Sequence, residues 1–350
     1  MDVNDDLAIA GGTEQLVLCR DRTTGTRSVI AVDDTTLGPA LGGVRYAWYR
    51  SEAEAVAEVR RLARAMTLKN ACADIPYGGG KSVIMKEPET PGRPQPDREE
   101  VMRGFGRFVA RLGGAYIPGV DMGTSVADLA TIGEVSPDVS CDHVDPSPYT
   151  ALGVLAALEA AVGVSGFSSL GGIRVLVQGA GHVGRSLAHR LSERSARVLV
   201  ADIDTARAEA VAKETGAEVI AAEAAMSTPC DVLAPCATAR VVHAGNVDAL
   251  PCRLLVGAAN DVLAHRDLDR RLADRGVLYV PDFVTNAGGV VEIHAIREGW
   301  DEPTTERAVL RIGDRVEELL RRGAATGRTP LEVAEEIASE RIGRQVQIPN

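Results

Sequence analysis

Two lysines, Lys69 and Lys81, are the residues whose type and spacing are most suggestive of chemistry. They lie twelve positions apart, and Lys81 directly follows the glycines Gly78 to Gly80. Consecutive glycines cost backbone entropy and add no side-chain packing, so they favour a backbone that closely approaches another group, such as a small ligand. A lysine at such a surface loses water, which lowers the pKa of its ammonium group toward neutral pH. This pattern favours Lys81 as a general base over a solvated lysine on a glycine-rich turn.

Further candidate groups lie elsewhere in the first half of the chain. Asp121 ends a short apolar strand, and from its position alone it either caps the following helix or faces the same site as the lysines. Lys69 comes at or just past the end of an expected helix that starts at Ser51, where a cation is also commonplace for structural reasons. Gly42 and Gly43 belong to an expected glycine-rich loop, whose backbone amides either hold an anion or form a plain turn.

The second half of the chain carries a dinucleotide-binding pattern. A buried strand over 173–178 is followed at once by a glycine-rich turn and a helix to about 194, and the next strand, 197–202, ends in Asp202. The glycines allow a pyrophosphate to reach the helix N-terminus, while Asp202 accepts a hydrogen bond from a ribose hydroxyl and repels the 2′-phosphate of NADP. The pattern therefore predicts NAD binding through Gly179, Ala180, Gly181, His182, Val183 and Gly184.

More α/β units follow this turn, and the loops after their strands are expected to face the cofactor. These loops hold Cys236, Asn260 and Asn286. The two asparagines are candidates to hydrogen-bond the nicotinamide or the substrate. The Cys236 thiol is interpreted as inert and buried. No pair of histidines is placed like a set of metal ligands, so we expect no metal.

Length and composition limit the possible classes of protein. A chain of 350 residues exceeds the usual size of one core, so two α/β domains are expected. The net charge of −11 argues against general nucleic-acid binding, and no run of about 18 apolar residues suggests a membrane span. The acidic Met1 to Asp6 does not look like a signal peptide, and the cysteines form no CxxC pair. Reduced thiols and a cytoplasmic location are therefore expected.

Eight short motifs together resemble one family. Their order and spacing are similar to those of the glutamate/leucine/phenylalanine/valine superfamily of amino-acid dehydrogenases, over nearly the whole chain, and most similar to the short leucine, valine and phenylalanine enzymes. The motifs are GPALGG (38–43), MTLKNA (66–71), PYGGGKS (76–82), GVDMGT (119–124), VQGAGHVG (177–184), APCA (234–237), GAAND (257–261) and PDFVTNAGG (281–289).

The resemblance implies a two-domain α/β fold. An N-terminal substrate-binding and oligomerisation domain would comprise residues 1–145, with the C-terminal helix of about 330–350 folding back onto it. A C-terminal Rossmann NAD-binding domain would comprise residues 146–329, with a cleft between the two domains. A homo-oligomer is expected by analogy with relatives, which assemble through the first domain.

The resemblance also implies roles for individual residues. Lys69 would bind the substrate α-carboxylate with help from the backbone of Gly42 and Gly43, Lys81 would be the general base that activates water, and Asp121 would relay protons. Burial and the charge of Lys69 would both lower the pKa of Lys81. The implied reaction is reversible NAD-dependent oxidative deamination of an L-amino acid to the 2-oxo acid and ammonia.

By matching positions, an apolar substrate side chain would contact Leu41, Met66, Gly119, Val290 and Ile293, without a cation to meet a side-chain carboxylate. Leucine, valine, phenylalanine or tryptophan are therefore open as substrates. Further expected cofactor contacts are Thr150, Ile203, Cys236, Ala237, Ala259, Asn260 and Asn286. Two alternatives remain: an NAD enzyme on the same scaffold acting on an unusual amino or oxo acid, and a non-catalytic NAD-binding sensor.

Overall fold

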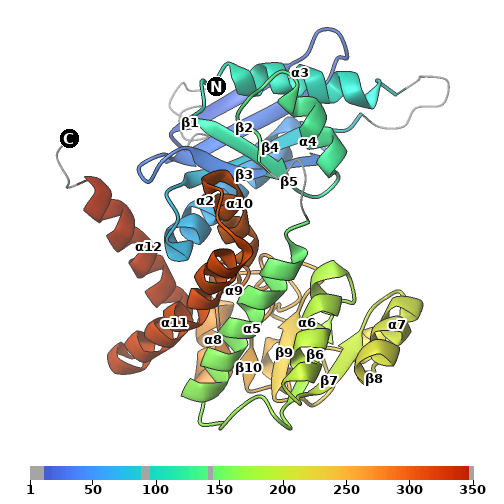
Figure 1. Cartoon of the computed structure of the whole chain (residues 1–350), viewed down its shortest axis with the longest axis vertical. Helices are drawn as coiled ribbons and strands as arrows, with labels where there is room; N and C mark the ends of the chain where they lie inside the picture. Colours follow the sequence, from blue (N-terminus) through green and yellow to red (C-terminus); the bar gives the residue numbers. More distant parts are fainter. Residues whose placement is uncertain (1–11, 88–94, 141–144, 347–350) are drawn as a thin grey trace. The chain divides into compact units, whose positions relative to one another are not determined.

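The chain folds into two compact units, one of residues 1–145 and 338–350 and the other of residues 146–337. A computed structural model describes residues 12–87, 95–140 and 145–346, and Figure 1 traces the two units along the chain. The N-terminal residues interpreted as lacking a signal peptide, and Cys141, lie outside the described residues. Each unit is built around one β-sheet.

The sheet of the first unit has five strands in the order β1-β2-β4-β3-β5. Strands β1, β2 and β4 pair antiparallel, whereas β3 pairs parallel with both β4 and β5. The parallel part therefore places the carboxyl ends of three strands at one edge. The strands are β1 (Gln15–Arg20), β2 (Arg27–Asp34), β3 (Ala40–Ala47), β4 (Gly78–Met85) and β5 (Tyr116–Val120).

Helices cover both faces of this sheet. Helix α2 (Glu52–Ala73) packs on one face, and α3 (Arg98–Ala110) and α4 (Val126–Gly133) pack on the other (Figure 1). On β4 the side chains alternate, with Val83 in the core under α2 and Ile84 in the core under α3 and α4. Because side chains alternate along a strand, Lys81 faces the α2 side, as Val83 does.

The two glycine-rich segments are strands, which corrects the loop expected at Gly42 and Gly43 and the turn considered before Lys81. Gly42 and Gly43 lie within β3, and Gly78 to Gly80 begin β4. A Cβ atom on Gly79 would lie 2.1 Å from Oγ1 of Thr67 in α2, and one on Gly80 would lie 2.8 Å from the ring of Tyr116. The glycines before Lys81 therefore allow close packing within the protein, and not the approach of a ligand.

Helix α2 also continues past the expected end. It runs to Ala73, so Lys69 lies inside the helix and not at its terminus. One residue later, the fully buried Asn70 donates from Nδ2 to the carbonyl oxygens of Gly78 at 2.6 Å and Leu41 at 3.4 Å. Asn70 thus ties the helix to strands β3 and β4 next to the residues expected to form the site.

The second unit contains a six-stranded parallel sheet in the order β11-β10-β9-β6-β7-β8. Numbered along this unit, the order is 3-2-1-4-5-6 from the β8 edge, which is that of the Rossmann fold. Its first and fourth strands are neighbours, so the chain reverses direction across the sheet between β6 and β9. The strands are β6 (Arg174–Gln178), β7 (Arg197–Ala201), β8 (Glu218–Val219), β9 (Val232–Pro235), β10 (Leu254–Leu255) and β11 (Leu278–Tyr279).

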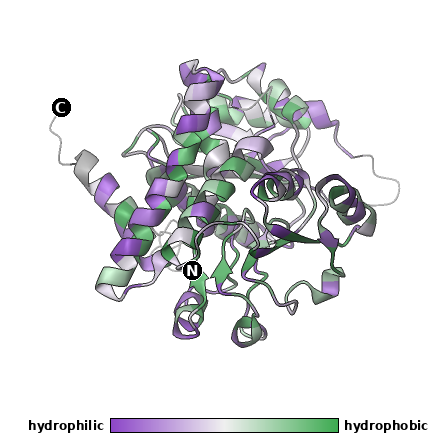
Figure 2. Ribbon diagram, turned by 60° about the horizontal axis from the view of Figure 1, so that its bottom comes forward, coloured by the Kyte–Doolittle hydropathy of each residue, from purple (hydrophilic) through white to green (hydrophobic). Residues whose placement is uncertain are grey.

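The helices of this unit connect and cover the strands. Figure 2 shows both hydrophobic and hydrophilic stretches along the helices of the chain. Two short 3-10 helices, Ala222–Ala224 and Val247–Ala249, complete the connections. The α-helices are α5 (Ser147–Val164), α6 (His182–Glu193), α7 (Thr205–Thr215), α8 (Leu268–Asp274), α9 (Asp282–Thr285), α10 (Gly288–Glu298) and α11 (Glu302–Thr326).

Helix α5 is apolar along its whole length. Within the described ranges, it is the helix that passes a test of length and composition for crossing a membrane, although the sequence had suggested no such run. It packs against α6, α10 and α11, and residues such as Val154, Leu155 and Leu158 are buried. The packing is that of a core helix, which is hydrophobic all round because it has neighbours on several sides.

The last helix, α12 (Pro330–Val346), is divided between the units. Its first part, to Ile337, belongs to the second unit, whereas residues from Ala338 onward group with the first. Arg341 donates to the carbonyl oxygens of Ala71 at 2.9 Å and Ile75 at 3.1 Å, at the end of α2. These bonds satisfy carbonyl groups that the C-terminus of a helix leaves without internal partners.

Asn70→Ala is expected to lower the free energy of unfolding by about 1–3 kcal/mol, because two buried carbonyl oxygens lose a donor. Gln15→Ala, on the exposed side of β1, is the matched control and should change it by less than about 0.5 kcal/mol. Urea unfolding of the three proteins measures both values. An Asn70→Ala variant as stable as the control would show that this amide does not hold α2 to the sheet.

Candidate active site

Lys81 lies in the middle of β4, under α2, with 6% of its surface exposed. Its Nζ atom is 3.1 Å from Oδ2 of Asp121, which follows β5. Burial lowers the pKa of Lys81, and the positive charge of Arg45 adds to this effect, while Asp121 acts in the opposite direction. The structure thus brings together a lysine and a carboxylate that lie forty positions apart in the sequence.

Asp121 is held by two cations. Oδ2 also accepts a hydrogen bond from Nε of Arg45 at 2.9 Å, so Lys81 and Arg45 share one oxygen atom. Burial alone would raise the pKa of Asp121, but Lys81 and Arg45 outweigh it and lower this pKa to about 2. The other end of the Arg45 guanidinium contacts Glu58 of α2. Asp121 therefore remains ionised at any pH at which the protein works.

Arg45 takes the electrostatic role that the sequence had suggested for Lys69. After burial, Arg45 is the cation that lowers the pKa of Lys81. Lys69 is half-buried on α2, one helical turn after Met66. Arg45 and Glu58 were missed from the sequence because the segment before Arg45 was interpreted as a loop. In a strand, Gly43 and Arg45 share a face, which would have placed Arg45 on the side of the site.

Gly43 borders the ion pair directly. A Cβ atom on this glycine would lie 2.7 Å from Cβ of Asp121 and 3.1 Å from Nζ of Lys81. Its register partner on β5 is Gly119, where the nearest atom to an added Cβ is Oγ of Ser140 at 3.2 Å. Both glycines are buried, and the missing side chain of Gly43 lets Asp121 and Lys81 approach β3 closely.

The other expected substrate contacts of the first unit lie around these glycines. A Cβ atom on Gly42 would lie 3.3 Å from Cγ of Met66. Leu41 lies on the same face of β3 as Gly43 but is almost completely buried, with 1% of its surface exposed. The structure therefore brings Gly42, Gly43 and Met66 close to Lys81 and makes Leu41 part of the wall behind them.

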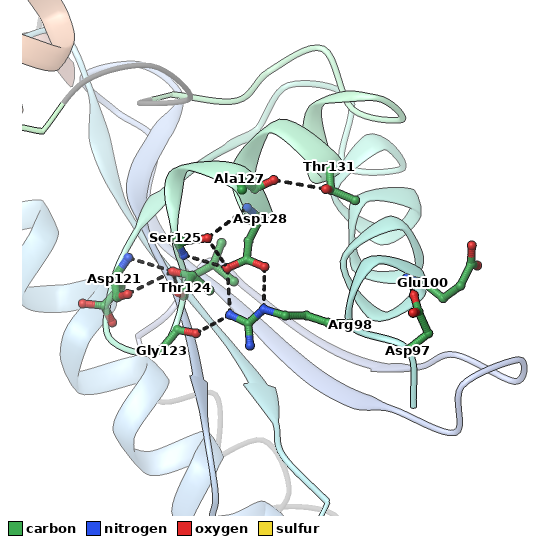
Figure 3. A network of polar contacts seen from close by, with 11 residues as sticks. Asp97, Arg98, Glu100, Asp121, Gly123, Thr124, Ser125, Ala127, Asp128 and Thr131 are labelled. Atoms are coloured by element: carbon green, nitrogen blue, oxygen red, sulfur yellow. Dashed lines mark hydrogen bonds and ion pairs between the residues drawn. The ribbon is translucent and has the colours of Figure 1, made fainter. Parts of the chain in front are cut away.

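A network of hydrogen bonds holds the loop that carries Asp121 (Figure 3). The Asp121 amide donates to Oγ1 of Thr124 at 3.0 Å, and this hydroxyl lies 2.8 Å from the carbonyl oxygen of Val44 on β3. Arg98 makes two hydrogen bonds to Asp128 and one to the carbonyl of Gly123, each 2.7 Å long. The N-cap of α4 is Ser125, so the carboxylate of Asp121 is free to point at Lys81.

In the second unit, the three glycines after β6 have three different roles. Gly179 has φ of +107°, in the region that favours glycine, and makes the tight turn. An added Cβ on Gly184 would lie 1.9 Å from the carbonyl oxygen of Gly179, so this glycine allows α6 to pack on the turn. An added Cβ on Gly181 would meet no atom within 4 Å. The space beside Gly181 is therefore where a pyrophosphate can approach the backbone.

Two residues that directly follow β7 are candidates for contacts with a dinucleotide. Asp202, after β7, accepts from the amide nitrogen of Ala180 at 2.6 Å and from that of Asp204 at 2.8 Å, which fixes the carboxylate beside the glycine turn. The next residue, Ile203, is 96% exposed and offers an apolar surface to a planar base. The acid that ends the second strand is thus placed where ribose recognition requires it.

Cys236 and Ala237 follow β9, at the point where the strand order reverses. A Cβ atom on Gly179 would lie 2.6 Å from Cβ of Ala237, so the segment after β9 packs closely on the glycine turn. Burial raises the pKa of the Cys236 thiol to about 12, which favours the protonated form, although the residue is half-buried and not fully buried as interpreted. At the start of α6, His182 is exposed and Val183 is half-buried, and both belong to the same turn.

The two asparagines lie in contact. Nδ2 of Asn286 donates to Oδ1 of Asn260 at 2.9 Å and to the carbonyl oxygen of Ala258 at 3.0 Å. Asn260 is exposed and the neighbouring Ala259 is buried. The amides thus belong to one polar cluster formed by the loops after β10 and β11.

The start of α10 packs against the start of α5, which carries Thr150. An added Cβ on Gly289 would lie 2.8 Å from Oγ1 of Thr150, and this hydroxyl donates to the carbonyl oxygen of Pro146 at 2.9 Å. Farther along α10, Val290 is 9% exposed and Ile293 is half-buried. The residues expected to bind cofactor and substrate therefore form two groups, each within its own unit.

Comparison with known proteins identifies the family of this chain. The model of the Glu/Leu/Phe/Val dehydrogenase dimerisation domain matches residues 14–136, and that of glutamate/leucine/phenylalanine/valine dehydrogenase matches residues 199–295. The chain belongs to this dehydrogenase family. It is an oxidoreductase of amino acids, acting on a CH–NH2 group.

Individual relatives resemble the dehydrogenase over nearly its whole length. It is 37% identical to leucine dehydrogenase of Thermoactinomyces intermedius, over 94% of this chain and 90% of the relative. It is 39% identical to valine dehydrogenase of Streptomyces virginiae, over 95% and 94%. The crystal structure of L-tryptophan dehydrogenase from Nostoc punctiforme superposes with a TM-score of 0.84 at 34% identity, covering 99% of both chains.

The use of lysine in the dehydrogenase supports a special role for two of these residues. Of its 38 lysines and arginines only four are lysines, and two of them are Lys69 and Lys81; the others are Lys86 and Lys213. Arginine serves as a permanent cation, whereas lysine can lose its proton when it is buried. Lys81 is thus one of few basic side chains in this chain that can lose a proton when buried.

Gly181→Ala is expected to weaken dinucleotide binding, whereas Gly184→Ala is expected to destabilise the fold. Gly181→Ala has room for its methyl group and should unfold like the parent protein, but it should weaken dinucleotide binding at least about tenfold by occupying the space for the pyrophosphate. Gly184→Ala should destabilise the fold by about 1–3 kcal/mol through overpacking. Thermal unfolding and titration with dinucleotide separate the two. Full dinucleotide affinity in a folded Gly181→Ala protein would exclude this turn as the pyrophosphate site.

Proposed function

We propose that the dehydrogenase catalyses the reversible, NAD-dependent oxidative deamination of an apolar L-amino acid to the 2-oxo acid and ammonia. The observation that carries the proposal is the ion pair of the buried Lys81 and the half-buried Asp121, 3.1 Å apart and next to Gly43. An amine with a lowered pKa next to an ionised carboxylate is suited to move protons to and from water and an amino group.

The residues of the second unit fit a nicotinamide dinucleotide through Gly181, Asp202 and Ile203. When bound, such a cofactor takes up the hydride from Cα of the amino acid and leaves an iminium group on the substrate. We propose NAD as the natural cofactor in preference to NADP. The support is the carboxylate of Asp202, which is fixed by two amide donors and would repel a 2′-phosphate.

Lys81 is proposed as the base of the hydrolytic step. Its neutral amine takes a proton from water as the oxygen adds to the iminium carbon, which gives a carbinolamine. The protonated amine then returns the proton to nitrogen and becomes neutral again. As the C–N bond breaks to release ammonia, Lys81 takes the hydroxyl proton, so that the C=O bond of the 2-oxo acid forms. Burial under α2 favours this cycle because it lowers the pKa of the amine and limits its contact with bulk water.

Asp121 is proposed to assist at the substrate amino group, and Lys69 at the α-carboxylate. Asp121 lies within hydrogen-bond distance of Lys81 and can pass a proton between that amine and the substrate nitrogen. Lys69 would bind the α-carboxylate together with the backbone of Gly42 and Gly43, which lie in β3. A carboxylate fixed in this way orients Cα, and such orientation contributes strongly to rate.

The substrate side chain is proposed to be apolar. The residues expected to contact it, Leu41, Met66, Gly119, Val290 and Ile293, present no charge. Relatives named leucine, valine and tryptophan dehydrogenase give the range of sizes to test. Because apolar pockets discriminate by only about 1–3 kcal/mol per methylene, overlapping activities on several amino acids are expected.

The proposed setting is a homo-oligomer in the cytoplasm. The description of residues 14–136 as a dimerisation domain supports self-association through the first unit. Five cysteines in the described part of the chain are free thiols, which supports a reducing compartment. Mass measurement in solution tests the first statement, and fractionation of cells that express the chain tests the second.

The direct test of the function is NADH formation with a panel of L-amino acids at alkaline pH. Activity is expected with branched-chain or aromatic substrates and not with glutamate or aspartate. Lys81→Ala should abolish turnover and leave NAD affinity nearly unchanged, because the lysine and the dinucleotide turn lie in different units. Lys86→Ala is the control, since that amine lies 5.2 Å from the ring of Tyr46 and outside the proposed site. Deamination by Lys81→Ala would refute the role of Lys81, and a panel without any substrate would favour an unusual amino acid or a binding function.

The pH dependence of the reaction should follow the proton of Lys81. Because the neutral amine is the base and burial lowers its pKa, kcat/KM should rise with pH through a midpoint below the usual lysine value of about 10.4. The midpoint is measured from kcat/KM against pH with several substrates whose amine pKa values differ. The amine pKa of each free amino acid is measured separately, so that titration of the substrate is distinguished from titration of Lys81. A midpoint that moves with the substrate alone would contradict this assignment.

A further inference from the structure

Arg45 connects both carboxylates of the site. Its guanidinium, on β3, donates from Nε to Oδ2 of Asp121 at 2.9 Å and contacts Glu58 of α2 through Nη1. Only 16% of the Arg45 side chain is exposed, and the exposed fractions of Asp121 and Glu58 are 18% and 26%. These are partly buried ion pairs, in which charge is screened much less than at the surface.

The geometry makes Arg45 and Lys81 competitors for one anion. Nζ of Lys81 and Nε of Arg45 approach the same oxygen atom, Oδ2 of Asp121, at 3.1 and 2.9 Å. With Asp121 as its sole partner, a buried lysine is held in the charged form, because the carboxylate attracts the ammonium. Arginine cannot lose its proton in a protein, so Arg45 remains a positive partner for Asp121 even when Lys81 is neutral.

We propose that Arg45 is a positioning residue, which orients the Asp121 carboxylate toward Lys81 and balances its charge so that the lysine amine is available as a base. The proposal rests on the function proposed above and extends it to a residue outside the expected site. Glu58 fixes the opposite end of the guanidinium from α2, so the helix and the sheet together determine where the positive charge lies.

Charged groups approach Lys81 from each element packed around it. Arg45 comes from β3, Asp121 from the loop after β5, and Glu58 from α2. Apart from burial, Arg45 lowers the pKa of Lys81, whereas Asp121 and Glu58 raise it. Tyr49 lies next to Glu58, and burial together with this carboxylate raises the tyrosine pKa, so the phenol stays neutral. Arg45 and Glu58 thus have opposite effects on the same amine.

This opposition distinguishes a charge-balancing role from a brace between the helix and the sheet. If Arg45 were only a brace, Arg45→Gln and Glu58→Gln would break the same contact and have the same consequence. If Arg45 balances charge, Arg45→Gln should raise the titration midpoint of Lys81 by about one pH unit or more, and Glu58→Gln should lower it by about half a unit. Arg45→Lys retains the charge and should remain within about half a unit of the parent.

The low number of lysines makes a direct measurement possible. Protein labelled with ¹³C at the lysine Cε positions gives signals from only four side chains, and that of Lys81 is assigned by its loss in Lys81→Arg. The chemical shift is followed against pH in the full chain without substrate, for the parent and the three variants. Arg27→Gln is the control, because Arg27 also lies between two glutamates, Glu52 and Glu87, at 3.1 and 3.7 Å.

Kinetics give the second readout. For Arg45→Gln, kcat/KM should fall about tenfold near pH 8 and recover as the pH is raised past the new midpoint. Loss that persists at all pH values, or the same direction of shift in Arg45→Gln and Glu58→Gln, would overturn the proposal. So would an Arg45→Gln midpoint equal to that of Arg27→Gln. If Arg45→Gln does not fold, the pair of Arg45→Lys and Glu58→Gln still tests the sign of the effect.

The NMR titration also separates this proposal from the function. Opposite shifts in a protein that oxidises no amino acid of the panel would support the arrangement around Lys81 and refute the proposed reaction. Amino-acid oxidation by a protein whose Lys81 titration midpoint does not change in Arg45→Gln would support the proposed reaction and refute the role of Arg45.

Discussion

The sharing of one carboxylate oxygen between a lysine and an arginine is the interaction on which the first unit depends. A buried amine has to stay near an anion that will handle protons, yet that anion tends to keep the amine charged. A second, permanent cation relieves this conflict. Arg45 provides it from the strand next to Lys81, and Asp121 remains ionised with a pKa of about 2. The parallel strands β3, β4 and β5 bring the three groups to one place.

Glycines in both units serve either packing or access, and the atoms around each one tell which. Gly79 and Gly80 allow α2 and Tyr116 to touch β4, and Gly184 allows α6 to touch the turn after β6. Gly43 allows Asp121 and Lys81 to approach β3, because an added Cβ would lie 2.7 Å from Cβ of Asp121 and 3.1 Å from Nζ of Lys81. Gly181 is different, since an added Cβ would meet no atom within 4 Å. The same residue type therefore marks either a tight interior or open space.

The loop carrying Asp121 shows how local hydrogen bonds support the site. Thr124 joins this loop to β3 at Val44, next to Arg45 in the chain. Arg98 of α3 joins it to the start of α4 through Asp128 and Gly123 (Figure 3). The carboxylate is thus held from its own backbone as well as by its charged partners. Such support keeps a reactive group within a small range of positions, which catalysis requires.

The sequence alone determined the type of fold and the strand, glycine turn and helix of the second unit, and it singled out Lys81 and Asp121 as candidates. These rest on local patterns, since a strand, glycine turn and helix are adjacent in the chain, and the family motifs are short. Only the tertiary structure decided that Gly42 and Gly43 lie in a strand, that Lys69 is inside α2, and that Arg45 accompanies Lys81. Those facts depend on which strands pair and which atoms approach across the sheet. Residues 45, 81 and 121 are distant in sequence, and their shared electrostatics exist only once β3, β4 and β5 are side by side.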